Sequence, residues 1–293
     1  MRAECTDDVT ETLIERYLSM VELNLSGIDD MVHENDDRSP LEQMIRRAAG
    51  NLTEKWRRGR KTLRTEVAYR ALRGYPDSTL NTSLTLDAMI NLLDDIYDEA
   101  LGKEEMALYI VELIRTIANM NHLVEDGERT TMERYFNKIL VIAFSEMHYR
   151  TRIKESVSYE EKLSSVIKCY EVKSTDMDVF IELPLRAKGL DDETTSRYTR
   201  LGRVHRAVSI IVKDLDDLEH DVEAGEETPV VLLFRESDGS AKRALDDCVK
   251  HFEDMAEGVW EEMPAGHREV GEGLYHMTAA VVDGYRGRLW EGR

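Results

Sequence analysis

Apolar residues recur along most of this chain at intervals of three and four, which is the spacing of one face of an α-helix. The pattern is clear at Leu86, Met89, Ile90 and Leu93, where an apolar stripe runs beside a polar one. Only five prolines interrupt the chain, and no alternating strand pattern or Asn-Gly hairpin signal competes with the helical one. The hydrophobic pattern therefore predicts an all-α protein.

Caps, prolines and glycines set the expected limits of the helices. A first helix is expected from the capping run at residues 6–8 to about residue 25, and a second from Pro40 to Trp56. A third covers Lys61 to Leu72 and stops at the Gly74-Tyr75-Pro76 run. A fourth helix carries residues 94–98, and another begins at about Asp192 and has residues 214–221 at its C-terminal end. Further helices are predicted near residues 103–122, 127–152, 158–172, 174–189 with a break at Pro184, 240–262 and 267–290.

No linker, repeat or low-complexity segment marks a domain boundary. We therefore expect a single all-helical domain over residues 1–293, a bundle built around a central cavity. At 42% hydrophobic residues the chain can fill a core, yet no apolar run approaches the roughly 18 residues of a membrane span. The N-terminus is acidic and lacks an apolar stretch, so no signal peptide is evident.

The cysteines and the charge indicate a cellular setting. Cys5, Cys169 and Cys248 are widely spaced and match no metal-binding pattern, which favours a reducing cytoplasm. The formal net charge is −20, which argues against nucleic acids and anionic membranes as partners because both are negative. A salty cytoplasm explains the acidic surface, and ordinary acidic drift explains it equally well.

Two groups of aspartates carry the candidate chemistry. Residues 94–98 read DDIYD, a DDxxD motif, and a second group extends over residues 214–221. Residues three or four apart share a helix face. This spacing puts Asp94 and Asp98 on one helix face. It puts Asp214, Asp217 and Asp221 together on another, over two turns. Carboxylates arrayed in this way repel one another unless a cation neutralises them, and Mg²⁺ bridges such ligands to phosphate. Two opposed faces would clamp a diphosphate.

With both groups on helices, the chain from about Gly59 to its C-terminus resembles the class I isoprenoid synthase superfamily. Members ionise a prenyl diphosphate with three Mg²⁺ ions held by two acidic motifs on facing helices, and homodimers are usual. The resemblance implies an Mg²⁺-dependent enzyme with a prenyl diphosphate substrate and a homodimeric state. It also implies metal ligands at Asp94, Asp98, Asp214, Asp217 and Asp221, with Asp95 supporting them.

One branch of this superfamily elongates prenyl diphosphates with isopentenyl diphosphate, and it carries a GGKRxR motif upstream. The stretch at residues 59–64 is similar, with Lys61 and Arg64 in place and Thr62 where that branch has arginine. The branch also has Arg-Arg-Gly after its first acidic motif, where this chain has no arginine over residues 99–103. In favour of elongation, residues 225–233 are similar to the GKxTLPxLL run that follows the second motif of that branch.

The terpene synthase branch matches other details. Its second motif, NDxxSxxxE followed by glycine, aligns with Lys213, Asp214, Asp217, Asp221 and Gly225 at every spacing. An ammonium has no lone pair, so Lys213 cannot replace the metal-binding asparagine. Lys213 either contacts the diphosphate or pairs with the neighbouring aspartates. The first motif, DDIYD followed by two glutamates, is also similar to this branch.

The resemblance further implies cations that hold diphosphate oxygens. Those at the ionisation site are Lys173, Arg206, Lys213 and Arg286, and those on the isopentenyl side are Lys61 and Arg64. Lys173 fits either branch, and a surface lysine at a helix start is the plain alternative. Met89 and Ile90 would line the cavity floor and, being non-aromatic, leave depth for a long chain. These features favour a terpene synthase that releases a diphosphate-free, cyclic or acyclic product, with a chain-elongating synthase as the alternative and a non-catalytic subunit as a third interpretation.

Overall fold

A computed structural model describes most of the chain after residue 63. The described residues are 11–13, 15, 16, 47, 50, 64–98, 102–124, 126–235 and 240–290. The helices expected before residue 57 therefore lie, apart from isolated positions, outside the described residues. Lys61 and Thr62 lie outside them as well, and so do the side chains of Tyr97 and Asp98.

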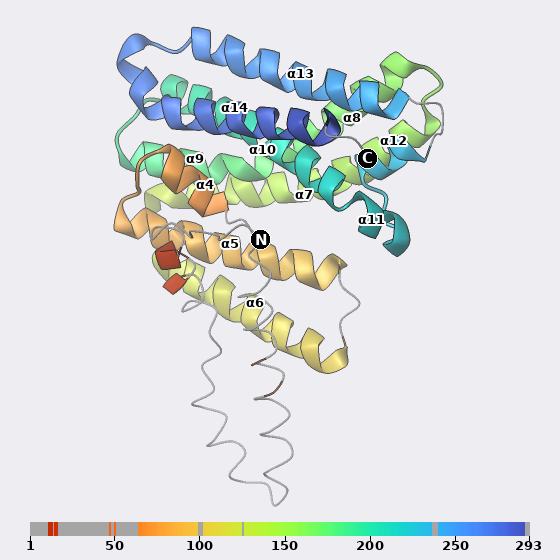
Figure 1. Ribbon diagram of the computed structural model, residues 1–293. Helices are drawn as coiled ribbons and strands as arrows, with labels where there is room; N and C mark the ends of the chain where they lie inside the picture. The colour runs from red at the N-terminus through yellow and green to blue at the C-terminus, as the bar shows by residue number, and fades with distance from the viewer. Residues whose placement is uncertain are drawn as a thin grey trace, which may run out of the picture. The chain divides into compact units, whose positions relative to one another are not determined.

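The described residues are helical and contain no strand, which confirms the predicted all-α class (Figure 1). The α-helices are α4 (Arg64–Ala71), α5 (Asp77–Asp98), α6 (Lys103–Leu123), α7 (Asp126–Glu155), α8 (Tyr159–Lys173), α9 (Asp178–Ala187), α10 (Asp192–Asp216), α11 (Leu218–Ala224), α12 (Pro229–Phe234), α13 (Ser240–Glu261) and α14 (Arg268–Trp290). Two 3₁₀ turns join them, η1 (Ser174–Met177) and η2 (Ala265–His267). None of the described helices combines the length and the apolar character needed to cross a bilayer.

The chain divides into two compact units. The first unit comprises Met1–Val67 and Asp77–Glu125, and the second comprises Ala68–Pro76 and Asp126–Arg293. The first acidic cluster lies in the first unit and the second cluster lies in the second unit. A single domain over residues 1–293 stays a prediction.

In the first unit, α5 and α6 pack against each other (Figure 1). α5 begins directly after Pro76, which cannot continue a preceding helix, and its side chains are buried on several faces. Leu84, Leu86, Ala88 and Leu92 are fully inaccessible to solvent. A helix buried this thoroughly gives a rigid base to the acidic residues at its C-terminal end.

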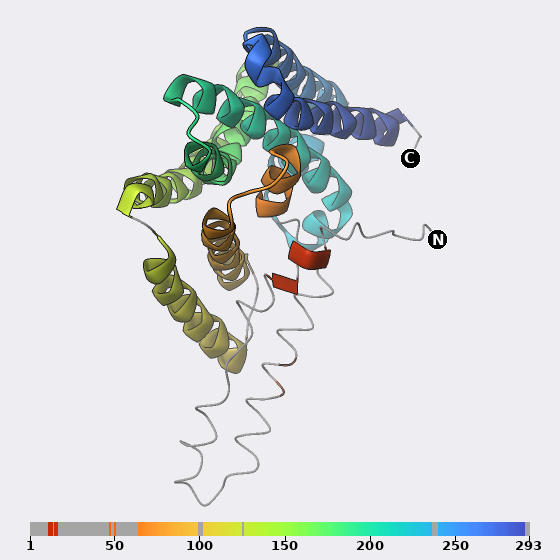
Figure 2. The same ribbon diagram turned by 90° about the vertical axis from the view of Figure 1, so that its left-hand side faces the viewer.

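In the second unit, α10 is the central helix and contacts α8, α9, α12, α13 and α14. Figures 1 and 2 show α13 and α14 lying beside α10 in both views. Asp191 caps α10, because its side chain accepts a 2.8 Å hydrogen bond from the backbone N–H of Thr194. The buried positions of α10 include Leu201, Val204 and Val208, which follow the three- and four-residue spacing of the sequence. This packing holds the C-terminal end of α10, where the second acidic cluster begins.

The predicted helix break at Pro184 is wrong. α9 continues through Pro184, and the interruption lies earlier, at the 3₁₀ turn η1. Proline lacks an N–H, so the carbonyl of Phe180 loses its usual donor four residues later. The hydroxyl of Tyr75 donates to that carbonyl instead, at 2.5 Å. The lost backbone hydrogen bond is thus replaced from a distant segment, which is why the helix tolerates the proline.

The second cluster does not lie on one continuous helix, contrary to the prediction. α10 ends at Asp216, Asp217 forms the junction with backbone angles of −88° and 0°, and α11 then extends to Ala224. Gly225 ends α11 with a φ of 77°, a left-handed conformation that favours glycine. The short helix α12, which the sequence pattern did not predict, follows with Thr228 as its cap and Pro229 in its first turn.

Candidate active site

The first acidic cluster occupies the last turns of α5. The side chain of Asp94 is about half exposed, whereas Asp95 is buried with 3% of its surface accessible. Asp98 is the last residue of α5. Asp94 therefore presents to solvent a carboxylate that can bind a cation, while Asp95 points into the protein. The supporting role of Asp95 stays a prediction.

A buried carboxylate that sequence reasoning did not assign, Asp87, anchors the segment before this cluster. Its Oδ2 accepts hydrogen bonds from the hydroxyl and the backbone N–H of Thr65, at 2.6 and 2.7 Å. Its Oδ1 lies 3.4 Å from the guanidinium of Arg64, which also reaches to 3.8 Å from Asp94. Burial raises the pKa of Asp87, and the Arg64 charge and Thr65 hydrogen bonds oppose that rise. Asp87 thus fixes the start of α4 and places Arg64 beside the first cluster.

In the second cluster, Asp214 is the buried member. Only 7% of it is accessible, and its Oδ2 accepts a 2.9 Å hydrogen bond from the hydroxyl of Tyr170, a fully buried residue of α8. Burial raises the pKa of Asp214, while the Lys173 ammonium and the Tyr170 hydrogen bond act in the opposite direction. The sequence offered no signal for Tyr170, because its contact joins helices that are distant along the chain.

The other aspartates of this cluster are more exposed and lie close to further carboxylates. Partial burial raises the pKa of Asp221, and the charges of Asp217 and Glu226 raise it further. Asp221 in turn raises the pKa of Asp214. The junction between α10 and α11 therefore keeps the three predicted ligands within electrostatic range of one another, although they belong to two helices. A divalent cation would relieve this repulsion.

Lys173 lies in a partly buried ion-pair network within electrostatic range of Asp214. Its ammonium donates to Oε1 of Glu146, on α7, at 2.9 Å, and Glu146 also pairs with Arg150. Burial lowers the pKa of Lys173, but the charges of Asp214 and Glu146 outweigh it, so the net pKa is raised. With 19% of its side chain accessible, Lys173 is a partly buried, ion-paired lysine, and its contact with diphosphate stays a prediction.

The remaining predicted diphosphate contacts have the following surroundings. The guanidinium of Arg206 forms a two-pronged pair with Asp176 of η1, with a closest distance of 2.9 Å. Arg286 is exposed on α14 and pairs with Glu253 of α13 at 2.6 Å. Lys213 is exposed, and its charge lowers the pKa of both Asp214 and Asp221. The roles of all three in diphosphate binding stay predictions.

The described residues contain no group of three or more His, Cys, Asp or Glu side chains arranged to hold a metal ion. The donor chemistry of the two clusters nevertheless suits Mg²⁺, since every predicted ligand is a carboxylate. Met89 and Ile90 are buried on α5, with 4% and 7% of their surfaces accessible. Their position agrees with an internal lining, and the cavity itself stays a prediction.

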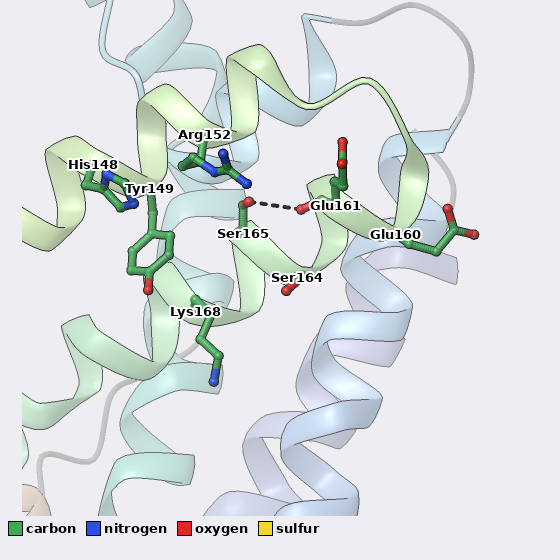
Figure 3. A pocket seen from close by; sticks show the side chains of 8 residues that line it. All are labelled: His148, Tyr149, Arg152, Glu160, Glu161, Ser164, Ser165 and Lys168. Atoms are coloured by element: carbon green, nitrogen blue, oxygen red, sulfur yellow. Dashed lines mark hydrogen bonds between the residues drawn. The ribbon is translucent and has the colours of Figure 1, made fainter.

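A shallow pocket lies elsewhere in the second unit, between α7 and α8 (Figure 3). Its walls include His148 and Arg152 from α7 and Ser165 and Lys168 from α8. No predicted site residue lines it. Lys168 is held by Glu171 on its own helix, at 2.5 Å. The pocket therefore has no direct connection with the residues of the acidic clusters.

No protein-family model matches the chain, and no curated protein matches it in sequence. Its structure, in contrast, is similar to solved geranylgeranyl pyrophosphate synthases. The enzyme from Corynebacterium glutamicum ATCC 13032 is 16% identical, with 96% of each chain covered and a TM-score of 0.56. The enzyme from the archaeon Geoglobus acetivorans is also 16% identical, with 94% of this chain and 99% of that chain covered and a TM-score of 0.56.

The chain has the class I isoprenoid synthase fold. A further structure of the Corynebacterium glutamicum enzyme, complexed with calcium and isoprenyl diphosphate, is 15% identical and gives a TM-score of 0.52. The match covers 96% of this chain and 99% of the chain in that structure. The fold expected from the two acidic motifs is thereby confirmed, although the sequence identity to these structures is only 15–16%.

Proposed function

We propose that this chain is an Mg²⁺-dependent class I isoprenoid synthase that ionises an allylic prenyl diphosphate and elongates it with isopentenyl diphosphate. Elongation takes precedence over the terpene synthase interpretation because the structurally similar proteins are geranylgeranyl pyrophosphate synthases over almost their entire length. One of them binds calcium and an isoprenyl diphosphate, which supports a divalent cation together with a diphosphate here. The run at residues 225–233, similar to that of elongating enzymes, points the same way.

The observation that carries the proposal is that a partly buried ammonium, Lys173, lies within electrostatic range of a buried carboxylate, Asp214, in the second unit. Lys173 and Asp214 interact electrostatically, and each is also held by another residue, Glu146 or Tyr170. A metal–diphosphate ligand needs both kinds of group, a cation for its oxygens and an anion for its metal. Because burial of charge is costly, each of these groups needs a partner, and a metal–diphosphate ligand would add further partners for both.

Each residue then has a defined task. Asp94, Asp98, Asp214, Asp217 and Asp221 would hold Mg²⁺, and three ions are expected by resemblance. The bound metal would neutralise the diphosphate leaving group as the allylic C–O bond breaks. Lys173 would donate hydrogen bonds to the departing oxygens. Arg64 and Lys61 would hold isopentenyl diphosphate, whose double bond forms the new C–C bond before a proton is lost. The apolar residues Met89 and Ile90 would surround the growing chain and exclude water.

A terpene synthase is the second candidate, and a specific observation favours it. Asp214, Asp217, Asp221 and Gly225 keep the spacing of that branch's second motif, and Gly225 ends the helix that follows it. Residues 99–103 also lack the arginines that the isopentenyl side of an elongating enzyme uses. In this case ionisation would proceed in the same way, and the carbocation would react within its own chain or with water.

Product analysis separates the candidates. The purified protein is incubated with Mg²⁺ and geranyl, farnesyl or geranylgeranyl diphosphate, with and without isopentenyl diphosphate, and the products are identified by mass spectrometry. A longer prenyl diphosphate that forms only with isopentenyl diphosphate is expected. A diphosphate-free hydrocarbon or alcohol formed from the allylic substrate alone would establish the terpene synthase instead. No product under any condition, with an Asp214→Asn control behaving identically, would favour the non-catalytic subunit.

We also propose that the protein is a homodimer. A row of exposed apolar side chains on α7 supports this proposal, comprising Phe136, Leu140, Val141, Phe144 and Met147. Their spacing puts them along one face of the helix. Large apolar side chains gathered on one helix face are typical of subunit contacts. A cytoplasmic location stays a prediction from the cysteines and the sequence of the N-terminus.

A further inference from the structure

Tyr170 contacts the second acidic cluster from outside both sequence motifs. It is fully buried on α8, and its hydroxyl donates to Oδ2 of Asp214 at 2.9 Å. A phenolic ring packed in a core can move its hydroxyl very little, so this hydrogen bond restrains the position of Oδ2 of Asp214. Among the described residues, Tyr170 is the hydrogen-bond donor to Asp214, which leaves Oδ1 for another ligand.

Glu146 has the matching relation to Lys173. Its Oε1 accepts from the Lys173 ammonium at 2.9 Å, and Arg150, one turn further along α7, pairs with the same oxygen. An ammonium has three donors, so Glu146 occupies one and leaves others for an incoming oxygen. Arg150 compensates the charge of Glu146, and Asp214 balances that of Lys173. The network is thus close to neutral before any ligand binds, which limits the cost of keeping it buried.

We propose that Tyr170 and Glu146 are positioning residues of the reaction: Tyr170 orients Asp214 toward a metal ion, and Glu146 orients Lys173 toward diphosphate oxygens. This inference rests on the proposed function and adds to it two residues that lie outside its motifs. It assigns a separate task to each, because Tyr170 touches the anionic partner and Glu146 touches the cationic one. Outer hydrogen-bond partners of metal ligands act in this way, by holding a ligand in its binding geometry.

The separate tasks give separate kinetic signatures. Tyr170→Phe removes one hydroxyl and keeps the ring, so we expect the Mg²⁺ concentration for half-maximal activity to rise by about 10–100-fold. At saturating Mg²⁺ its KM for the allylic diphosphate should change less than about threefold. Glu146→Gln keeps the shape and removes the charge, so we expect that KM to rise about tenfold, as for the loss of a charged hydrogen-bond partner. Its Mg²⁺ requirement should stay within about threefold of wild type.

Tyr198→Phe is the matched control. Tyr198 lies on α10, sixteen residues before Asp214, and is also fully buried. Its hydroxyl donates to the backbone carbonyl of His267. This variant should keep both the Mg²⁺ requirement and the KM of wild type. A second measurement does not use turnover: Mg²⁺ with inorganic pyrophosphate should raise the melting temperature of wild type and of Tyr198→Phe, and Tyr170→Phe should need more Mg²⁺ for the same rise.

The outcomes distinguish this inference from the proposed function. If wild type neither forms product nor binds Mg²⁺ with pyrophosphate, the proposed function fails. If wild type does both, and Tyr170→Phe and Glu146→Gln match Tyr198→Phe in Mg²⁺ requirement and KM, the positioning roles are wrong and the function stands. A uniform loss of kcat in all three variants would also overturn them, because it indicates general destabilisation. Should Tyr170→Phe fail to fold, Glu146→Gln decides, and an unchanged KM in that variant overturns the proposal.

Discussion

The guanidinium of Arg64 lies 3.8 Å from the carboxylate of Asp94. Arg64 belongs to the stretch that resembles the GGKRxR motif of elongating synthases, and Asp94 belongs to the first aspartate cluster, a candidate metal site. The same guanidinium lies 3.4 Å from the buried Asp87. One arginine therefore connects a structural anchor with a candidate ligand, so its replacement should affect stability and activity for different reasons.

The first prediction concerns this anchor. Arg64→Gln leaves Asp87 buried without its cation, and we expect a loss of about 3 kcal/mol in the free energy of unfolding. Adding Asp87→Asn should restore much of that loss, because the amide has no charge to compensate and still accepts from Thr65. Urea unfolding at pH 7 measures both. Arg73→Gln, which removes an exposed pair with Glu269, is the control and should cost less than about 1 kcal/mol.

Arg64→Gln could instead lower the free energy of unfolding by the same amount with and without Asp87→Asn. That result would contradict this assignment, since the two residues would then act independently. The activity of the double variant carries separate information. A stable double variant with a raised KM for isopentenyl diphosphate would support a substrate contact for Arg64.

The local pattern of the sequence was sufficient for the all-α class and for most of the long helices, but not for α12 or for the end of α10. The spacing of Leu86, Met89 and Ile90 predicts α5 because it reflects one face of one helix, and all three are buried. The junction at Asp217 was not predictable in this way, because no proline or glycine marks it. Tyr170 and Glu146 were missed because their partners are Asp214 and Lys173, on other helices. Pairing between distant segments leaves no periodic signal in the sequence.

The second prediction concerns the proposed metal ligands. Asp94→Asn with Asp98→Asn removes two carboxylates from the end of α5, and product formation should fall by roughly two orders of magnitude or more. The melting temperature without metal should hold or rise, because the change removes like charges from one helix face. Glu257→Gln, at an exposed position of α13, is the control. Undiminished turnover in the double variant would refute the assignment of the first cluster to metal binding.

The third prediction concerns the apolar row on α7. Phe144 is 64% exposed in the single chain, and Phe144→Arg would place a charge in the middle of the proposed subunit contact. Light scattering after gel filtration should give a dimer for wild type and a monomer for the variant. Val157→Arg is the control, because Val157 is exposed to 93% but lies outside the row. A dimer that survives Phe144→Arg would exclude this face as the contact.

The fourth prediction concerns pH and His205, a residue of α10 with 5% of its surface accessible. Burial, together with the charge of the neighbouring Arg206, lowers the pKa of His205 to about 4. Its Nδ1 has no hydrogen-bond partner among the described residues. An unfolded histidine titrates near 6.5, so the unfolded chain binds a proton between these values while the folded chain does not. The stability that His205 contributes is therefore present above about pH 6.5 and is lost as the pH falls toward 4.

Between pH 7 and pH 5 this loss should amount to about 2 kcal/mol for wild type, from the two pKa values and the linkage relation. His205→Gln has no proton to gain, so the pH dependence of its unfolding free energy should be shallower by that amount. Other groups titrate equally in both proteins, and their effect cancels in the difference. Urea unfolding of the two proteins at pH 7 and pH 5 makes the comparison. Parallel pH profiles would mean that His205 takes up its proton in the folded protein as readily as in the unfolded one.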